Sequence, residues 1–336
     1  MSQSPKPDQG SNEQAAPITV DPSYLPRDAP DNDNDSLLST TTTATSTQSI
    51  TSSVLRFREI HGRTYQNYEG AEYWQPNDDK QNDGLDLQHH MMLLLAGNKL
   101  FRAPLEDPQS VLDVGTGTGI WAVDFAEQFP GATVIGTDLS PIQPPWVPPN
   151  CSFELDDATR EWTYADGKFD FVHIRYLTGS IPDWKKVYEQ AYRCLKPGGW
   201  IEHTDFTIEG TTYDWWTKFF VDAGEKIGRT FLVTKDNQNV GWLKDSGFTG
   251  PIHVKNHKMP IGTWPADETL KEVGAFNLVA CEQGLEGFAV LLGTQILGYS
   301  YEELQVIFAD MRKCLRNKAY HAYYPASTTW TQKPLD

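Results

Sequence analysis

The feature that most constrains the fold is the stretch from Val111 to Pro141, VLDVGTGTGIWAVDFAEQFPGATVIGTDLSP. An apolar run leads into three glycines at alternate positions, a helical pattern, a second apolar run and an acidic residue. Glycine has no Cβ and permits positive φ, so such a loop lets a ligand approach bare backbone. The N-terminus of the following helix presents unpaired N–H groups to a polar or anionic group. The stretch therefore predicts a strand–turn–helix–strand unit with a ligand at its first turn, because a plain turn does not need three glycines.

The glycine spacing narrows the kind of ligand. A dinucleotide fingerprint, G-x-G-x-x-G, would need a glycine at position 120, which is Ile120. No lysine follows the glycines, which excludes a P-loop. Asp113 lies at the strand end, where its carboxylate would repel a pyrophosphate and could accept a hydrogen bond from an ammonium group. Gly115, Gly117 and Gly119 would then form the platform.

Asp138 ends the second apolar run, and an acid at this place can bind both hydroxyls of a ribose. The alternative is a solvated turn residue ahead of Ser140 and Pro141. An acid for an ammonium group, a glycine platform and an acid for a ribose together describe an aminoacyl nucleoside without phosphates. S-adenosylmethionine is such a molecule.

The pattern from residue 110 onward predicts an α/β fold with a parallel, doubly wound sheet. Strands are expected at 110–115, 132–138, 152–157, 169–175 and 199–206, and helices at 121–129 and 184–195. Lys196-Pro197-Gly198-Gly199 turns the second of these helices into the last of these strands. Further helices are expected at 213–228, 239–248, 267–298 (broken at its glycines) and 299–315, with Ser300 and Glu303 as a capping box, and a final strand at 319–333.

The chain divides into three parts by composition. Residues 1–53 are rich in Ser, Thr, Asp, Asn, Gln and Pro and are expected to be disordered, because they cannot bury enough apolar area. Residues 54–109 are expected to form an N-terminal helical lid layer. Its helix has apolar residues at helical spacing (Leu87, Met91, Leu94 and Leu95) and Asp83 or Asp86 as its cap. Residues 110–336 form the main domain.

Charge and cysteine content exclude several classes of function. The net charge of -17 argues against nucleic acid and against an anionic membrane surface as partners. The four cysteines contain no CxxC pair, which argues against a zinc ribbon and a disulfide scaffold, and no metal is expected. MSQSPKPDQG lacks the apolar segment of a secretory signal, which predicts a cytoplasmic location.

At this point a family can be recognised. VLDVGTGTG, GTDLSP, LDDA and LKPGGWIE resemble class I methyltransferases that depend on S-adenosylmethionine (SAM). That resemblance implies a Rossmann-like, mostly parallel seven-stranded sheet with an antiparallel final hairpin, here with an N-terminal helical layer and helical insertions. YWQPNDDKQNDGLDLQHHM, FVHIRYLTGSIPDWKKVYEQAYRCLKPGGWIEHTDF and NKAYHAYYP are similar to the fungal LaeA-like group, over most of residues 60 to 325. Members of that group are linked to secondary metabolism as global regulators or as pathway methyltransferases.

The resemblance also implies site residues. Asp113, Gly115, Gly117 and Gly119 match the motif around the methionine part of SAM. Asp138 matches the ribose acid and Leu139 lies beside the adenine. Asp157 and Ala158 match the turn at the adenine edge, with Asp156 as the neighbouring alternative. His173 and Arg175 match the strand end that faces the methyl group, while Tyr65 and Gln88-His89-His90 lie on the expected lid.

Methyl transfer needs a base only when the acceptor atom carries a proton that must leave. His203, at the end of the fifth expected strand, and His173 are the candidate catalytic residues. Glu202, His89 and His90 are alternatives, and for each histidine an ordinary structural role is the more frequent outcome. His89 and His90 point about 100° apart on a helix, which excludes them as a metal-binding pair. Trp215, Trp216, Phe219 and Phe220 suit a buried helix face or an apolar acceptor pocket.

Two functions follow from these patterns. The first is a SAM-dependent methyltransferase that acts on a small-molecule acceptor in fungal secondary metabolism. The alternative is a LaeA-like nuclear regulator that acts through protein partners. A methyltransferase fold that binds SAM without transferring a methyl group is a third hypothesis, because fold does not fix function.

Overall fold

The chain folds around one central sheet that carries helices on both faces. The computed structural model describes residues 9–24, 57–69, 71, 73–208 and 214–336. Most of the expected disordered tail (1–53), the boundary at residue 54 and the first residue of the helix expected at 213–228 lie outside these ranges. Within them the order of strands in the sheet is β1-β9-β10-β8-β7-β4-β5-β6.

The five strands expected in the first part of the domain are confirmed and are parallel to one another. They are β4 (Ser110–Val114), β5 (Thr133–Asp138), β6 (Cys151–Leu155), β7 (Phe169–Arg175) and β8 (Leu195–Phe206). Strand β8 begins earlier than expected, because it includes the Lys196–Gly199 segment. The register of its pairing with β7 shifts at this segment, between Phe169 and Phe171. The carboxyl ends of β4, β5 and β7 therefore meet at one edge, where ligands of such sheets bind.

Beyond β8, on the side away from β7, the sheet continues with an antiparallel strand. The expected final strand is confirmed as β10 (Tyr323–Gln332), which pairs antiparallel with both β8 and β9 (Ile252–Pro260). Strand β9 was missed because IHVKNHKMP alternates basic and polar residues with few apolar ones. These seven strands reproduce the expected sheet with its antiparallel final hairpin.

An eighth strand comes from the segment that was expected to be disordered. Ser11–Glu13 (β1) pairs parallel with β9, and Val20 bridges Pro265. A short helical turn, η1 (Pro22–Tyr24), follows. The Lys271 ammonium lies 2.7 Å from the carboxylate of Asp21, which ties this segment to the main domain. The expectation of disorder was therefore wrong for residues 9–24, which gain backbone pairing from β9 instead of a core of their own.

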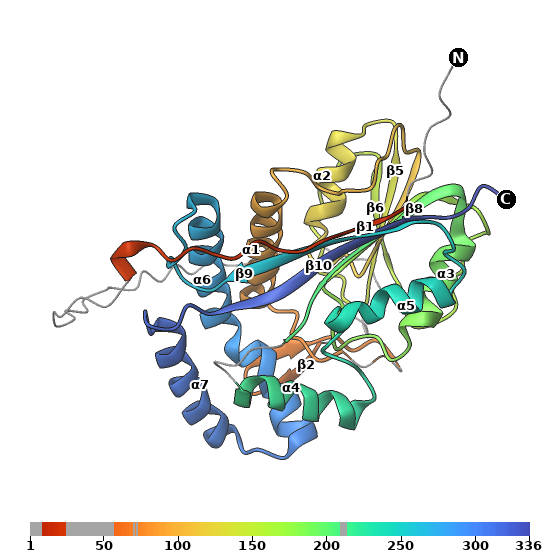
Figure 1. Cartoon of the computed structure of the whole chain (residues 1–336). Helices are drawn as coiled ribbons and strands as arrows, with labels where there is room; N and C mark the ends of the chain where they lie inside the picture. Colours follow the sequence, from red (N-terminus) through yellow and green to blue (C-terminus); the bar gives the residue numbers. More distant parts are fainter. Residues whose placement is uncertain (1–8, 25–56, 70, 72, 209–213) are drawn as a thin grey trace.

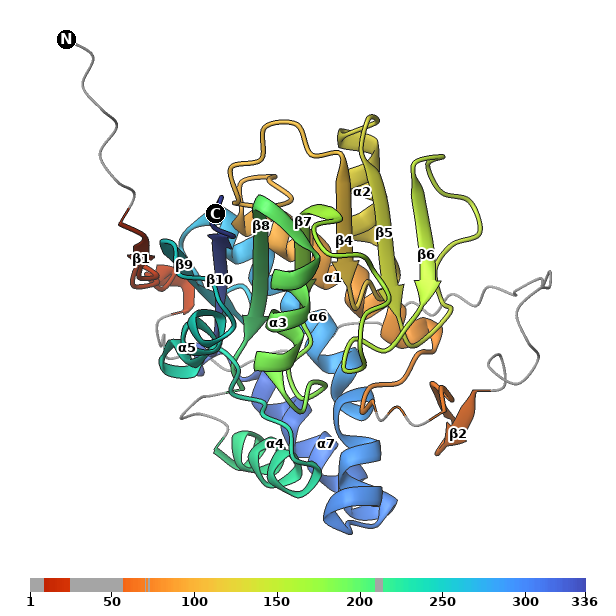
Figure 2. The same ribbon diagram turned by 90° about the vertical axis from the view of Figure 1, so that its right-hand side faces the viewer.

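Helices cover both faces of the sheet (Figures 1 and 2). Helices α3 (Trp184–Cys194) and α5 (Gln238–Asp245) lie on one face, and α1 (Asp79–Leu95), α2 (Ile120–Gln128) and α6 (Glu268–Leu291) lie on the other. Helices α4 (Asp214–Ile227) and α7 (Tyr301–Arg316) lie beyond the carboxyl ends of the parallel strands (Figure 2). A short turn, η2 (Lys235–Asn237), precedes α5. The site edge of the sheet is therefore overlaid by helical insertions, as expected.

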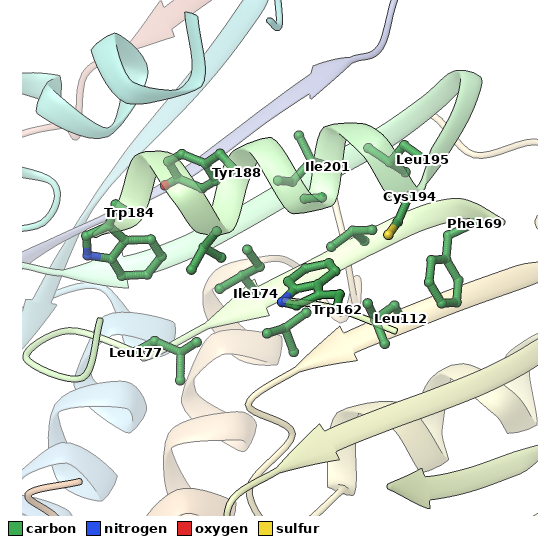
Figure 3. Packing of buried hydrophobic residues seen from close by; sticks show 14 of the residues in the cluster. Leu112, Trp162, Phe169, Ile174, Leu177, Trp184, Tyr188, Cys194, Leu195 and Ile201 are labelled. Carbon is green, nitrogen blue, oxygen red and sulfur yellow. The ribbon is translucent and has the colours of Figure 1, made fainter. Parts of the chain in front are cut away.

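The core between the sheet and α3 holds the strands rigidly (Figure 3). Helix α3 buries Trp184, Val187, Tyr188, Ala191 and Cys194 in a cluster with the apolar side chains of β4, β7 and β8. Burying such side chains contributes roughly 1.5–3 kcal/mol each before the entropic cost is counted. This packing fixes where β7 and β8 end, and so where their last side chains lie.

Two expectations about helices were wrong in detail. Helix α1 begins after Asp78, whose side chain accepts from the backbone N–H of Gln81, and not after Asp83 or Asp86. Helix α6 is continuous through its glycines. Gly274 allows close contact with a neighbouring segment, since a Cβ there would lie 2.0 Å from the carbonyl oxygen of Gly262. Instead the helix widens into a π-helical turn, η3 (Leu292–Leu297), and ends at Gly298. The expected capping box of Ser300 and Glu303 on α7 is confirmed.

The layer expected at 54–109 is only partly helical. In its described part, β2 (Arg58–Ile60) and β3 (Arg63–Tyr65) form a small antiparallel hairpin ahead of α1. Arg63 binds Asp78 through two hydrogen bonds of 2.6 and 2.8 Å, which joins the hairpin to the N-terminus of α1. Bidentate pairs of this kind fix geometry strongly.

By length and composition, the helical stretch Glu268–Leu297 is apolar enough to cross a membrane, and it is the one such stretch in the described part of the chain. Its α6 portion contacts α1, α7 and β9. Buried residues of α6, such as Val273, Leu285 and Val290, join clusters with these neighbours. Packing inside the fold is a sufficient reason for its apolar composition.

Candidate functional site: a cleft at the carboxyl ends of β4, β5 and β7

The glycine loop between β4 and α2 forms the floor of a cleft. Gly115, Gly117 and Gly119 have φ of 69°, 58° and 81°, in the left-handed region that favours glycine. A Cβ at Gly115 would lie 2.5 Å from Leu177 and one at Gly119 would lie 2.3 Å from Phe153. Gly115 and Gly117 line the cleft, whereas Gly119 caps α2 and packs against Phe153. Conformation therefore favours glycine at all three positions, and space also requires it at Gly115 and Gly119.

Asp138 at the end of β5 faces this loop. One of its carboxylate oxygens accepts from the backbone N–H of Gly117 at 2.8 Å, and the other accepts from the N–H of Ser140 at 2.9 Å. Burial raises the pKa of Asp138 to about 6, against the opposing effect of these hydrogen bonds. A carboxylate that is held by the glycine loop and lines the cleft can accept further hydrogen bonds from ligand hydroxyls.

Asp113 lies beneath the loop instead of in the cleft wall. Its two carboxylate oxygens bind the Thr116 hydroxyl at 2.6 Å and the His173 Nδ1 at 2.7 Å. The carboxylate is buried, and the His173 ring stacks on Trp121 at 3.7 Å. Asp113 thus holds the loop and the neighbouring strand in register, and its contact with an ammonium group stays a prediction.

The turn after β6 brings two further carboxylates to the cleft. Asp156, Asp157 and Ala158 all line it. Asp157 is buried and accepts from the backbone N–H and the hydroxyl of Thr159, at 2.9 and 2.7 Å. Its carboxylate serves the turn itself, and the turn presents backbone and Ala158 to the cleft.

The structure brings most of the predicted cofactor residues together. Gly115, Gly117, Asp138, Leu139, Asp157, Ala158 and Arg175 line one narrow cleft. Asp113 and Gly119 lie directly behind it. The roles that the family resemblance gives to these residues stay predictions, because the cleft shows their placement only.

A chain of polar side chains links this cleft to helix α1. Arg175 Nη2 lies 3.0 Å from His89 Nδ1, and His89 Nε2 lies 2.9 Å from the Asp124 carboxylate on α2. Burial lowers the pKa of His89. A neutral ring that donates from Nε2 to Asp124 can accept from the guanidinium at Nδ1. The His89 contact thus gives Arg175 a defined place at the end of β7.

The predicted catalytic histidines do not line the cleft. His203 is buried among core residues, with Nδ1 2.6 Å from the Tyr188 hydroxyl and Nε2 3.3 Å from Asp205. Its side of β8 faces α3, where the ring stacks on Trp184 at 4.5 Å. Burial lowers the pKa of His173 to about 4, against the opposing effect of Asp113. Their catalytic roles stay predictions, and the contacts shown are structural.

Glu202, the carboxylate alternative among the catalytic candidates, also makes structural contacts. It is buried and accepts from the backbone N–H groups of Arg102 and Ala103 at 2.7 and 2.8 Å. Burial raises its pKa to about 7. It anchors the loop before β4 on the α1 side of the sheet.

Two aromatic residues of the cleft were missed. Tyr73, which donates to Gln75 at 2.8 Å, and Tyr176, which follows β7, both line it. Tyr176 has φ of 58° and a buried hydroxyl without a hydrogen-bond partner in the described structure. The sequence shows an aromatic cluster around Tyr73, but no sequence pattern predicts that Tyr176 has a left-handed backbone conformation.

A second, larger cavity of about 590 Å³ lies next to the cleft. It is bounded by α4, α6, α7, β9 and β10, and by Gln14 and Ala15 of the N-terminal segment. Of the aromatic residues on α4, Trp216 and Phe220 line it, while Trp215 is exposed. The buried helix face is confirmed for Phe219 and Phe220, which belong to the core, whereas an acceptor pocket stays a prediction.

The strand order, in which antiparallel β10 lies between β8 and β9, and a glycine loop flanked by acids at the ends of β4 and β5 define the class I methyltransferase type of α/β fold. The model of the methyltransferase domain family matches residues 87–249. Methyltransferase pytC of Aspergillus terreus is 37% identical over 320 residues, which cover 91% of this chain and 94% of pytC. The chain belongs to this methyltransferase family.

Other relatives are fungal regulators. The secondary metabolism regulator laeA of Monascus pilosus is 31% identical over 82% of this chain and 78% of its own length. Among solved structures, phosphoethanolamine N-methyltransferase 2 of Haemonchus contortus, in complex with S-adenosyl-L-methionine, matches with a TM-score of 0.50. It is 20% identical and the match covers 81% of this chain and 62% of that one, a likeness that bears on the fold alone.

Proposed function

We propose that this protein is a SAM-dependent methyltransferase whose acceptor is a small molecule of fungal secondary metabolism. One observation carries the proposal: the bare backbone of Gly115 and Gly117, the Asp138 carboxylate and the Asp157–Ala158 turn line a single cleft. Membership of the methyltransferase family and the similarity to pytC support it.

The residues of the cleft suit SAM by their chemistry. Asp138 would accept from the ribose hydroxyls, and the Asp157–Ala158 turn and Leu139 would border the adenine. Arg175 forms no ion pair within the described part of the chain and would attract the carboxylate of the amino-acid portion. The glycine platform would let the ligand approach because no Cβ blocks it.

SAM supplies a methyl group on a positively charged sulfur, which leaves readily in an in-line displacement. The protein therefore acts mainly by holding the acceptor atom in line with the methyl group and by excluding water. A base is required only for an acceptor that keeps its proton up to the attack.

The test is incubation of the purified protein with isotope-labelled SAM and an extract from a strain that lacks the gene. Mass spectrometry then identifies the compound that gains the label. The proposal predicts label in one small molecule or in a few related ones. Absence of SAM binding, or label in protein alone, would contradict it.

The similarity to laeA supports a second candidate, a regulator of secondary metabolism that acts through protein partners in the nucleus. Deletion of the gene followed by metabolite profiling separates the two. Build-up of one precursor that lacks a methyl group supports the pathway enzyme, which is expected in the cytoplasm. Loss of many unrelated compounds supports the regulator.

A further inference from the structure

The large cavity of about 590 Å³ and the glycine-loop cleft are lined by neighbouring residues of the same segments. Tyr73 lines the cleft and the next residue, Trp74, lines the cavity. On α1, Leu85 lines the cleft and Gln88, one turn later, lines the cavity. The same short segments therefore border both spaces.

A row of aromatic rings leads from one space to the other. The ring centre of Tyr176, at the cleft, lies 5.6 Å from that of Phe206. The ring centre of Phe206 lies 5.5 Å from that of Tyr324 in the cavity wall. The Tyr176 hydroxyl is buried without a partner in the described structure, and its residue has left-handed backbone. Buried polar groups without partners and strained backbone are concentrated at functional sites. Both features lie where the two spaces adjoin.

The wall of the cavity is mostly apolar. It is formed by aliphatic and aromatic side chains from α4, α6 and α7, among them Trp216, Phe220, Leu285, Phe288, Met311 and Leu315. Pockets with such walls bind small molecules by burying apolar surface, while a few polar groups set orientation. An extended polar peptide would leave its backbone groups unsatisfied against this wall.

The cavity is lined by basic side chains. No Asp or Glu of the described chain lines it, in a protein with 45 acidic and 28 basic residues. Lys258 does line it, with its ammonium 5.3 Å from the centre of the Tyr323 ring and no ion pair within the described residues. His321 also lines it, and its Nε2 is buried without a partner there. These groups donate to or attract an oxygen-rich, anionic group.

We propose that this cavity binds the methyl acceptor, and that the acceptor is a mainly apolar small molecule with an acidic oxygen group. The acidic group binds at Lys258 and His321, and the apolar body lies against α4, α6 and α7. The opposite end reaches Tyr176, next to the cleft. This inference rests on the proposed function, since it names the acceptor class for the same reaction.

The test uses 8-anilinonaphthalene-1-sulfonate, an apolar fluorescent probe with one anionic group, and the full-length protein. Fluorescence titration measures the affinity of the probe, and calorimetry measures SAM affinity on the same samples. Ala280 lines the cavity on α6, so Ala280→Phe fills space and should weaken probe binding about tenfold or more. Lys258→Gln removes the cation and should weaken it about tenfold, whereas Lys244→Gln, on the exposed surface of α5, should change nothing.

The outcomes separate this inference from the proposed function. SAM affinity and unfolding temperature should be unchanged in Lys258→Gln, which shows that the variant is folded. Unchanged probe affinity in both Ala280→Phe and Lys258→Gln would overturn the cavity as a binding site. Weaker probe binding in Ala280→Phe alone would overturn the inference that the acceptor carries an acidic group. Failure of the wild type to bind SAM would contradict the proposed function, whatever the probe does.

Discussion

The guanidinium of Arg175 lies 3.0 Å from Nδ1 of His89, which joins the end of β7 to helix α1. His89 in turn lies 2.9 Å from Asp124 on α2, so one neutral ring connects three elements around the cleft. The sequence places these residues far apart and gives no pattern that pairs them. The contact explains how a partly buried arginine can keep one position without an ion pair.

His89→Ala should weaken SAM binding about fivefold, because Arg175 loses the group that holds it at the cleft. His89→Gln retains a hydrogen-bond acceptor and should lose less. His90→Gln is the matched control, since His90 is an exposed neighbour on the same helix. Isothermal titration calorimetry measures all three. Equal affinities in His89→Ala and the wild type would show that His89 does not position Arg175 for the ligand.

SAM affinity should depend on the ionisation of Asp138. Burial raises the pKa of this carboxyl to about 6, and its charged form accepts hydrogen bonds from ribose hydroxyls more strongly than its protonated form does. The bound ligand therefore lowers the pKa, and affinity should be full above pH 7 and fall by up to about tenfold per pH unit below pH 6. Titrations between about pH 5 and about pH 8, the range around that pKa, measure the effect.

Asp138→Asn should remove this pH dependence and lower affinity about tenfold at pH 7. Asp245→Asn, on the exposed surface of α5, serves as the control. A pH profile that is the same in Asp138→Asn and in the wild type would assign the titration to another group.

Gly119→Ala should destabilise the fold by about 2–3 kcal/mol. The residue has φ of 81°, and a Cβ there would lie 2.3 Å from the Phe153 ring. Gly131→Ala is the control, because nothing lies within 4 Å of a Cβ at that position and its φ is not in the left-handed region. Thermal unfolding of the two variants compares them. A similar unfolding temperature in both would show that the loop tolerates side chains.

Tyr176→Phe should reduce methyl transfer to the labelled compound without weakening SAM binding. The change removes only a hydroxyl that has no partner in the described structure, so the fold should be unaffected or slightly stabilised. A parallel change in SAM affinity would assign the hydroxyl to the cofactor side instead. Tyr68→Phe, outside both cavities, controls for general effects of the substitution.

The parts of the fold that could be predicted from sequence are those set by local patterns. Apolar runs ended by glycine or acid predicted β4 and β5, and the Ser300–Glu303 box predicted the start of α7. Strands β1 and β9 could not be found in this way. Their side chains are largely polar, and they are strands because β10 and β9 offer backbone partners from distant parts of the chain.

The cleft was readable from the sequence because it is built on the backbone conformation of a short glycine motif. The larger cavity was not, because its wall combines α4, α6, α7, β9 and β10, which meet only in the folded chain. His203 shows the same limit. A histidine at a strand end looks catalytic in sequence, but its ring faces α3 and is held by Tyr188 and Asp205.

The most direct test of the central claim is a crystal structure of the protein with S-adenosylhomocysteine. The account predicts both ribose hydroxyls within hydrogen-bond distance of Asp138, the amino-acid portion over Gly115 and Gly117, and the adenine at the Asp157–Ala158 turn. A cleft without the ligand at saturating concentration, or a ligand bound elsewhere on the chain, would contradict it.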